Sequence, residues 1–128
     1  MFSIKCIDHI VLRVRDVDSM VSFYCETLGC KIENIQKEIE LTQLRAGDSI
    51  IDLLKVEDNA ASTNRNLDHF CLRIDPFNYD SLKKYFQSKG IEIYKFGERN
   101  GAQGIGPSFY LKDPDGNEIE LKQGLPNV

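Results

Sequence analysis

The two histidines are the residues of this chain best suited to chemistry. The 128-residue sequence contains only His9 and His69, which lie 60 residues apart, and an aspartate precedes each of them. Imidazole binds divalent metals and also transfers protons near neutral pH. The two residues therefore predict a metal or acid–base site if the fold places carboxylates beside them.

Both histidines belong to an internal repeat. Residues 7–14, IDHIVLRV, match residues 67–74, LDHFCLRI, with Asp, His, Leu and Arg identical. A repeat with this period indicates two copies of one supersecondary unit. Each copy has the apolar pattern of a strand, and each is followed by a predicted helix, at 16–28 and at 78–89. Asp16 and Asn78 would cap these helices, and a glycine follows each of them.

Three further strands are predicted after each helix. They fall at 31–35, 39–44 and 50–56 in the first half, and at 91–96, 108–111 and 118–122 in the second. Each half therefore reads as a βαβββ module, and the fold class is α+β. We expect one domain over 1–128, with module one at about 5–57, a polar linker at 58–66 and module two at about 67–123.

The alternation of side chains along a strand predicts which residues share a face. In the first strand Ile10 and Leu12 would face the helix, so His9 would point to the opposite side. The same argument gives a set of four residues on one sheet face: His9, Asp52, His69 and Glu120.

Two imidazoles with one or two carboxylates suit Zn, Ni, Co, Mn or Fe(II), with positions left open for a substrate. The alternative is a pair of structural histidines that donate hydrogen bonds to carbonyl groups. Arg73 and Lys122 share the same face, where they would neutralise the carboxylates or contact an acid group of the substrate.

Composition narrows the classes of partner. The formal net charge is −4 and there is no long basic run, which argues against nucleic acid. No apolar run approaches the roughly 20 residues of a membrane helix. The N-terminus lacks the pattern of a secretory signal, so we expect a cytoplasmic protein with its four cysteines reduced.

Several motifs together resemble the vicinal oxygen chelate superfamily, the group of glyoxalases, bleomycin-resistance proteins and extradiol dioxygenases. They are Asp8-His9-Ile10, Phe23-Tyr24 with Leu28-Gly29, Asp68-His69, and the segment DPDGNEIE at 113–120. The resemblance runs from Ile7 to about Gln123. It implies that the two βαβββ modules form a curved mixed sheet, and that the protein is a homodimer.

The resemblance also implies a ligand set. In the family, the two strand histidines and the glutamate that follows the Asp-Pro-Asp-Gly turn bind a divalent metal, which assigns this role to His9, His69 and Glu120. Members similar to glyoxalase I add a glutamate where this chain has Asp52. Because aspartate is one methylene shorter, Asp52 would bind the metal directly, through water, or only by hydrogen bonding near it.

The reaction implied by the resemblance is a metal-assisted proton transfer next to a carbonyl. Glu120 would be both ligand and base. Asp52 would stabilise or perform the proton delivery on the opposite side of the reacting carbon. The glycine-rich segment 97–107 is expected to be a mobile flap, or else a hairpin loop without a role. Arg13, Arg73 and Arg99 are weaker candidates for contacts with an anionic part of the substrate.

We therefore expect a glyoxalase-like lyase or isomerase that acts on a small molecule or on its thiol adduct. One alternative is a metal-free protein that sequesters a drug, as bleomycin-resistance proteins do. Another is a thiol transferase of the fosfomycin-resistance type, which would use the same three ligands. The absence of tryptophan disfavours a drug-stacking groove.

Overall fold

The computed structural model describes residues 1–57 and 66–125 of the chain, which divides into two compact units, Met1–Asn64 and Arg65–Val128. The predicted linker at 58–66 lies almost entirely outside the described residues. Each unit contains one βαβββ module, so the predicted α+β fold with two such modules is confirmed.

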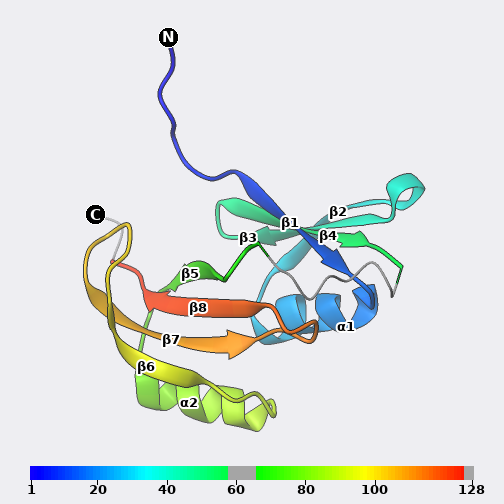
Figure 1. The fold of residues 1–128 in the computed structure, drawn as a ribbon. Coiled ribbons are helices and arrows are strands. Elements are labelled where there is room, and N and C mark those ends of the chain that lie inside the picture. The colour runs from blue at the N-terminus through cyan, green and yellow to red at the C-terminus, as the bar shows by residue number, and fades with distance from the viewer. Residues whose placement is uncertain (58–65, 126–128) are drawn as a thin grey trace. The chain divides into compact units, whose positions relative to one another are not determined.

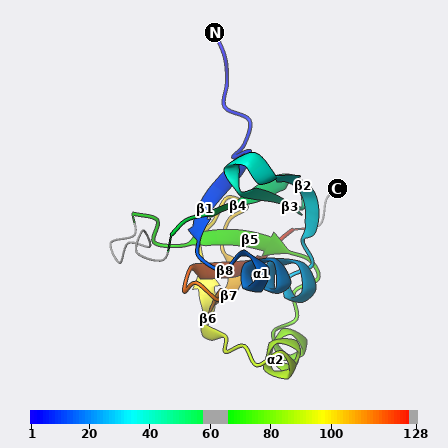
Figure 2. The same ribbon diagram turned by 90° about the vertical axis from the view of Figure 1, so that its right-hand side faces the viewer.

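The first unit forms a four-stranded mixed sheet in the order β1-β4-β3-β2 (Figures 1 and 2). β1 and β4 are parallel, and the other neighbours are antiparallel. The elements of this unit are β1 (His9–Val14), α1 (Val17–Val21), the π-helix η1 (Ser22–Thr27), β2 (Lys31–Gln36), the 3₁₀ helix η2 (Lys37–Ile39), β3 (Leu41–Ala46) and β4 (Ser49–Lys55).

The second unit repeats this plan, with the order β5-β8-β7-β6 and a parallel pair β5 and β8. Its elements are β5 (Phe70–Ile74), α2 (Tyr79–Ser88), β6 (Tyr94–Arg99), β7 (Gly106–Lys112) and β8 (Glu118–Gln123). The repeat found in the sequence therefore places the two aspartate–histidine pairs at the start of equivalent strands, β1 and β5.

The predicted caps form at both helices. Asp16 accepts a hydrogen bond from the backbone N–H of Ser19, and Asn78 accepts one from that of Ser81. These bonds satisfy donors that the first turn of a helix leaves unpaired. Gly29, at φ 85°, ends the first helical segment in the left-handed region where glycine is unstrained.

Each unit buries its own apolar core on the helix side of its sheet. In the first unit, Leu12, Val14 and Leu53 are buried, and Met20 of α1 is fully buried. In the second unit α2 lies along β6 in Figure 1, and the ring of Phe86 meets that of Phe109 at 6.0 Å. The helices thus cover one face of each sheet, which leaves the other face for the polar side chains.

The strands differ from the sequence prediction mainly at their starts. β1 begins at His9 rather than at residue 7, and β5 begins at Phe70 rather than at residue 67. The predicted helix at 16–28 is a short α-helix continued by the π-helix η1. Residues 97–107 belong to the β6–β7 hairpin: Gly97 and Arg99 of β6 pair with Ser108 and Gly106 of β7.

Candidate functional site

The second unit brings two of the predicted ligands into contact. His69 immediately precedes β5, and Glu120 lies in the neighbouring strand β8, opposite Cys71. The Nε2 atom of His69 is 3.2 Å from Oε1 of Glu120. Glu120 is only 6% exposed, and its other oxygen, Oε2, is buried without a hydrogen-bond partner among the described residues. An ionised carboxylate in this position has unused capacity for a cation.

The aspartate before each histidine fixes the orientation of the ring. The Nδ1 atom of His69 lies 2.6 Å from Asp68, and that of His9 lies 2.9 Å from Asp8. When Nδ1–H donates to a carboxylate, Nε2 carries the lone pair that can bind a metal. The repeated Asp-His dipeptide therefore prepares both imidazoles in the same way.

Asp52 lies on β4, which is parallel to β1 and hydrogen-bonded to it. It pairs with Val11, so it is diagonal to His9 across the two strands. Its side chain is 4% exposed, and Oδ1 is buried without a hydrogen-bond partner among the described residues. The hydrogen bond that His9 donates to Asp8 raises the pKa of His9, burial opposes this shift, and the charge of Asp52 adds to it.

Each unit thus holds two of the four predicted ligands, His9 with Asp52 and His69 with Glu120. Within residues 1–57 and 66–125, no group of three or more His, Cys, Asp or Glu side chains is close enough to hold a metal. The donor types nevertheless fit a divalent cation. Both buried carboxylates have an oxygen without a hydrogen-bond partner among the described residues, and Nδ1 of each imidazole is held by an aspartate.

Tyr110 belongs to this site and was not predicted from the sequence. It lies on β7 directly opposite Glu120, and its hydroxyl donates a hydrogen bond to Oε1 at 3.2 Å. Its ring also meets that of His69 edge-on, at a centroid distance of 5.1 Å. Burial and, next, the charge of Glu120 raise the pKa of Tyr110, so the phenol stays protonated and able to donate. The only signal in the sequence was the register that the turn at 113–117 sets between β7 and β8.

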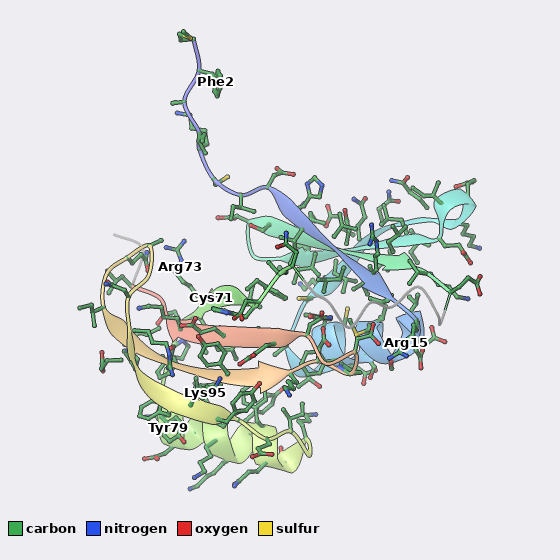
Figure 3. The ribbon with its side chains drawn as sticks, in the orientation of Figure 1. Phe2, Arg15, Cys71, Arg73, Tyr79 and Lys95 are labelled. Atoms are coloured by element: carbon green, nitrogen blue, oxygen red, sulfur yellow. The ribbon has the colours of Figure 1, made fainter. Side chains whose placement is uncertain are left out.

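The three candidate arginines have different surroundings. Arg99 donates hydrogen bonds to the carbonyl and hydroxyl oxygens of Ser108, at 3.2 and 3.0 Å, and its guanidinium lies 4.9 Å from the centre of the Tyr110 ring. Arg73 is exposed on β5 beyond Cys71, and both are labelled in Figure 3. Arg13 is exposed on β1, in the first unit.

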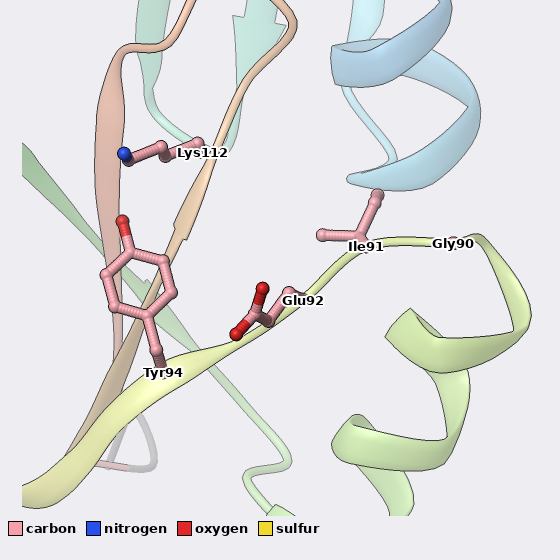
Figure 4. Close-up of a pocket in the computed structure, with 5 residues that line it drawn as sticks. All are labelled: Gly90, Ile91, Glu92, Tyr94 and Lys112. Atoms are coloured by element: carbon pink, nitrogen blue, oxygen red, sulfur yellow. The ribbon is translucent and has the colours of Figure 1, made fainter.

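Two pockets open on the second unit near these residues. A pocket of about 160 Å³ is lined by His69, Asp68, Lys112 and Glu118, among others. A wider one, of about 470 Å³, is lined by Tyr94, Glu92 and Lys112 together with Gly90 and Ile91. In Figure 4 the hydroxyl of Tyr94 and the amino group of Lys112 lie on the same side of this pocket. His69 is thus accessible to a small molecule.

The four cysteines carry free thiols. Cys71 shares a face with Glu120, and partial desolvation together with the charge of Glu120 raises its pKa to about 11. It is therefore a neutral thiol at physiological pH. The described part of the chain contains no helix of the length and hydrophobicity needed to cross a bilayer.

The sequence is similar to those of several known proteins. The profile of the Glyoxalase/Bleomycin resistance protein/Dioxygenase superfamily matches residues 6–121. The virulence protein STM3117 of Salmonella typhimurium is 33% identical over 91% of this chain and 83% of its own length. The glutathione transferase FosA of Serratia marcescens is 26% identical over 94% of this chain and 82% of its own length.

Comparison with solved structures supports the same family. The crystal structure of the Salmonella virulence protein has a TM-score of 0.78 at 29% identity, covering 97% of this chain and 100% of that one. A lactoylglutathione lyase from Agrobacterium tumefaciens, at 22% identity, shares the fold with a TM-score of 0.69 over 93% of each chain. Sequence, topology and structural likeness lead to one conclusion: the chain belongs to the glyoxalase, bleomycin-resistance protein and dioxygenase superfamily.

Proposed function

We propose that the protein is a metal-dependent lyase or isomerase of the glyoxalase I type, which chelates two neighbouring oxygens of a small substrate and moves a proton next to a carbonyl. The observation that carries this proposal is the pair of His69 and Glu120, 3.2 Å apart, in which a buried glutamate oxygen has no partner among the described residues. This atom supports a cation at the site, because an unsatisfied buried carboxylate oxygen costs free energy that a bound cation would offset.

The proposed metal ligands are His9, Asp52, His69 and Glu120, within one chain or across a dimer. Members of the superfamily commonly use such ions, and Ni, Zn, Co, Mn and Fe(II) all suit this donor set. When bound, the metal would act as a Lewis acid that stabilises negative charge on the substrate oxygens. Asp52 is proposed as a ligand or as a group that hydrogen-bonds beside the metal.

Glu120 is the proposed base. Its carboxylate takes the proton from the carbon next to the carbonyl, while the electron pair left behind moves onto the carbonyl oxygen. The proton then returns to the former carbonyl carbon, and the hydroxyl proton of the first carbon moves to the former carbonyl oxygen, so substrate and product are isomers. Tyr110 positions the base, because its hydroxyl donates to Oε1. Asp52 is the proposed proton donor or acceptor on the opposite side of the carbon.

The proposed partners are a small oxygenated molecule or its thiol adduct, and a second copy of this chain in a homodimer. The thiol adduct is supported by the Serratia relative, whose name is glutathione transferase. Arg13, Arg73 and Arg99 are proposed contacts for an anionic part of the substrate. The test below also distinguishes two alternatives, a fosfomycin-type thiol transferase and a metal-free drug-binding protein.

The test is deuterium exchange followed by NMR. Protein loaded with Ni, Zn, Co or Mn is incubated in D₂O with hemithioacetals and small 2-hydroxycarbonyl compounds, and deuterium is measured at the carbon next to the carbonyl. Metal-loaded wild type should exchange this position, and Glu120→Gln should exchange it on the order of 100-fold more slowly, because the base is lost. Glu118→Gln is the matched control, since Glu118 lies on the same strand and pairs with Lys95 at 3.6 Å.

The proposal is wrong if Glu120→Gln exchanges as fast as wild type, or if no metal-loaded sample exchanges any of the compounds. Consumption of fosfomycin together with a thiol in the same samples would favour the transferase instead. Binding of small aromatic cations by protein without metal would favour the sequestering alternative.

A further inference from the structure

We propose that the first unit contains a binding site for a small zwitterion with an apolar side chain, of the chemical class of the aliphatic amino acids. The site is a cavity of about 290 Å³. None of the proposed metal ligands lines it, so the inference does not depend on the proposed function. The residues that do line it include two apolar side chains, three charged ones and one threonine: Val17, Ile35, Lys37, Glu40, Lys55 and Thr42.

The register of the strands places this cavity on the helix side of the sheet. Thr42 on β3 pairs with Ile35 on β2 and with Leu53 on β4, and Leu53 belongs to the buried core. Paired residues share a face, and successive side chains of a strand point to opposite faces, so Asp52 points away from the cavity. The cavity and the proposed metal ligand of β4 therefore lie on opposite faces of one sheet.

Backbone hydrogen bonds hold three charged residues at one edge of the cavity. The N–H of Glu40 donates to the carbonyl of Lys37 at 3.2 Å, and the N–H of Lys55 donates to the carbonyl of Glu40 at 3.0 Å. These bonds connect the end of β4 to the tip of the β2–β3 hairpin, where η2 lies (Figure 1). Their side chains form no ion pair within the part of the chain that the structure describes. Two ammonium groups and one carboxylate are therefore available to a ligand.

Glu40 has a backbone conformation that residues with a side chain rarely adopt. It follows η2 with φ 53° and ψ 45°, in the left-handed region. A residue with a Cβ atom is strained there, whereas glycine is not. Strained residues of this kind are concentrated at ligand-binding and catalytic sites, where the side chain is needed. The strain at Glu40 thus points to a use for its carboxylate.

The charges and the apolar lining together define the ligand. Lys37 and Lys55 suit a carboxylate, whereas Glu40 suits an ammonium group. A ligand with a single charge would leave one sign at this edge unmatched, and a zwitterion matches both. Val17 and Ile35 offer apolar surface to its side chain, and no aromatic residue is among the described residues of the lining, which disfavours a nucleobase.

The volume limits the size of the ligand. Pockets for small molecules begin at about 300 Å³, and this cavity lies at that limit. It is too small for a dinucleotide or a peptide of several residues. A single aliphatic amino acid such as leucine meets the conditions of charge, polarity and size.

The test measures binding of L-leucine to the full chain without metal, by isothermal titration calorimetry. Three further probes each lack one part of leucine: 4-methylpentanoate has no ammonium group, 3-methylbutylamine has no carboxylate, and glycine has no apolar side chain. Leucine should bind, and each of the three probes should bind at least about tenfold more weakly, because one part of the cavity loses its partner.

Variants test the assigned residues. Lys55→Met and Glu40→Gln each remove one charge with little change in volume, and each should weaken leucine binding about tenfold. The matched controls are Lys31→Met on β2 and Glu38→Gln in η2, because both residues are exposed and neither lines the cavity. Glu40→Gly should also weaken binding while unfolding at the same or a higher temperature than wild type, because glycine relieves the left-handed backbone.

The inference is overturned if leucine does not bind, if any of the three probes binds as tightly as leucine, or if either Lys55→Met or Glu40→Gln binds leucine as wild type does. His69→Ala separates it from the proposed function, because His69 lies in the second unit. This variant should bind leucine normally, and loss of leucine binding in it would place the ligand at the proposed metal site instead. Absence of leucine binding together with intact metal binding would remove only the site proposed here.

Discussion

At the scale of single residues, the aspartate of each Asp-His dipeptide orients the histidine ring that follows it. Asp8 and Asp68 each accept a hydrogen bond from the Nδ1 atom of the following histidine, which turns Nε2 away from the aspartate on both rings. The sequence shows this pair twice, and adjacent residues need no tertiary structure to interact. The repeat alone therefore singles out both histidines, whereas the role of the two aspartates emerges only from the structure.

Substitution of Asp68 tests the role of the ring orientation. Asp68→Ala should lower the affinity for a divalent metal about 10- to 100-fold, because His69 loses the group that fixes its tautomer. Asp68→Asn keeps an acceptor and should lose less. Isothermal titration with Zn or Ni measures both, and equal affinity in Asp68→Ala and wild type would contradict the assigned role.

Tyr110→Phe tests the positioning of the base. The variant removes only the hydroxyl that donates to Glu120, so it should retain the metal but exchange the substrate proton about tenfold more slowly. Metal content and NMR exchange rate are measured on the same sample. An unchanged rate would show that Tyr110 does not position Glu120.

Tyr110 also shows which site residues could not be predicted from sequence motifs. The two histidines and Glu120 could be identified because they lie in motifs, whereas Tyr110 reaches Glu120 only through the pairing of β7 with β8. Asp113 sets that pairing by accepting hydrogen bonds from the backbone N–H groups of Asp115 and Asn117, at 2.9 Å each. Cross-strand neighbours cannot be assigned until such a register is known.

At the scale of elements, the helix starts were easier to predict than the strand starts. Caps at Asp16 and Asn78 are local, because the acceptor and donor are three residues apart. A strand exists only where a partner lies beside it. β1 begins at His9, where its pairing with Ile50 of β4 begins, and β5 begins at Phe70, where its pairing with Ile119 of β8 begins.

The cap of α2 has a measurable contribution. Asn78→Ala should lower the free energy of unfolding by about 1 kcal/mol, because the backbone N–H of Ser81 loses its acceptor. Asn78→Asp should lose little, since aspartate caps equally well. Urea unfolding measures both, and equal stability of Asn78→Ala and wild type would contradict the assigned cap.

The β2–β3 hairpin predicts a pH effect. Arg45 donates to Glu33 at 3.2 Å, and this hydrogen bond, helped by the charge, lowers the pKa of Glu33. The stabilisation by the pair is therefore present above the ordinary pKa of the glutamate, and is lost as the pH falls through the lowered one. In Arg45→Ala the pKa of Glu33 should return upward, which an NMR titration of its carboxyl measures. A superimposable titration curve would contradict the ion pair.

At the scale of the whole molecule, the two-module plan follows from the repeat, and each unit has its own sheet and core. The proposed ligands are divided equally: His9 and Asp52 lie in the first unit, and His69 and Glu120 in the second. The proposed function assigns residues of both units to metal binding, so a substitution of a proposed ligand in either unit should weaken it. If His9 and Asp52, and His69 and Glu120, were instead two unrelated pairs of structural residues, substitutions in them would not affect metal binding.

Metal content and thermal stability of wild type, His9→Ala and His69→Ala, measured with and without added Ni, Zn, Co and Mn, test this claim most directly. Lys84→Ala serves as the control, because it changes an exposed residue outside the site. We predict about one bound ion per chain in wild type and in the control. At a metal concentration about 100 times the dissociation constant, the ion should stabilise the folded protein by about 2.7 kcal/mol. Each histidine variant should lose both the bound ion and this stabilisation. Retention of the ion by either histidine variant, or its absence from wild type, would contradict the proposed metal site.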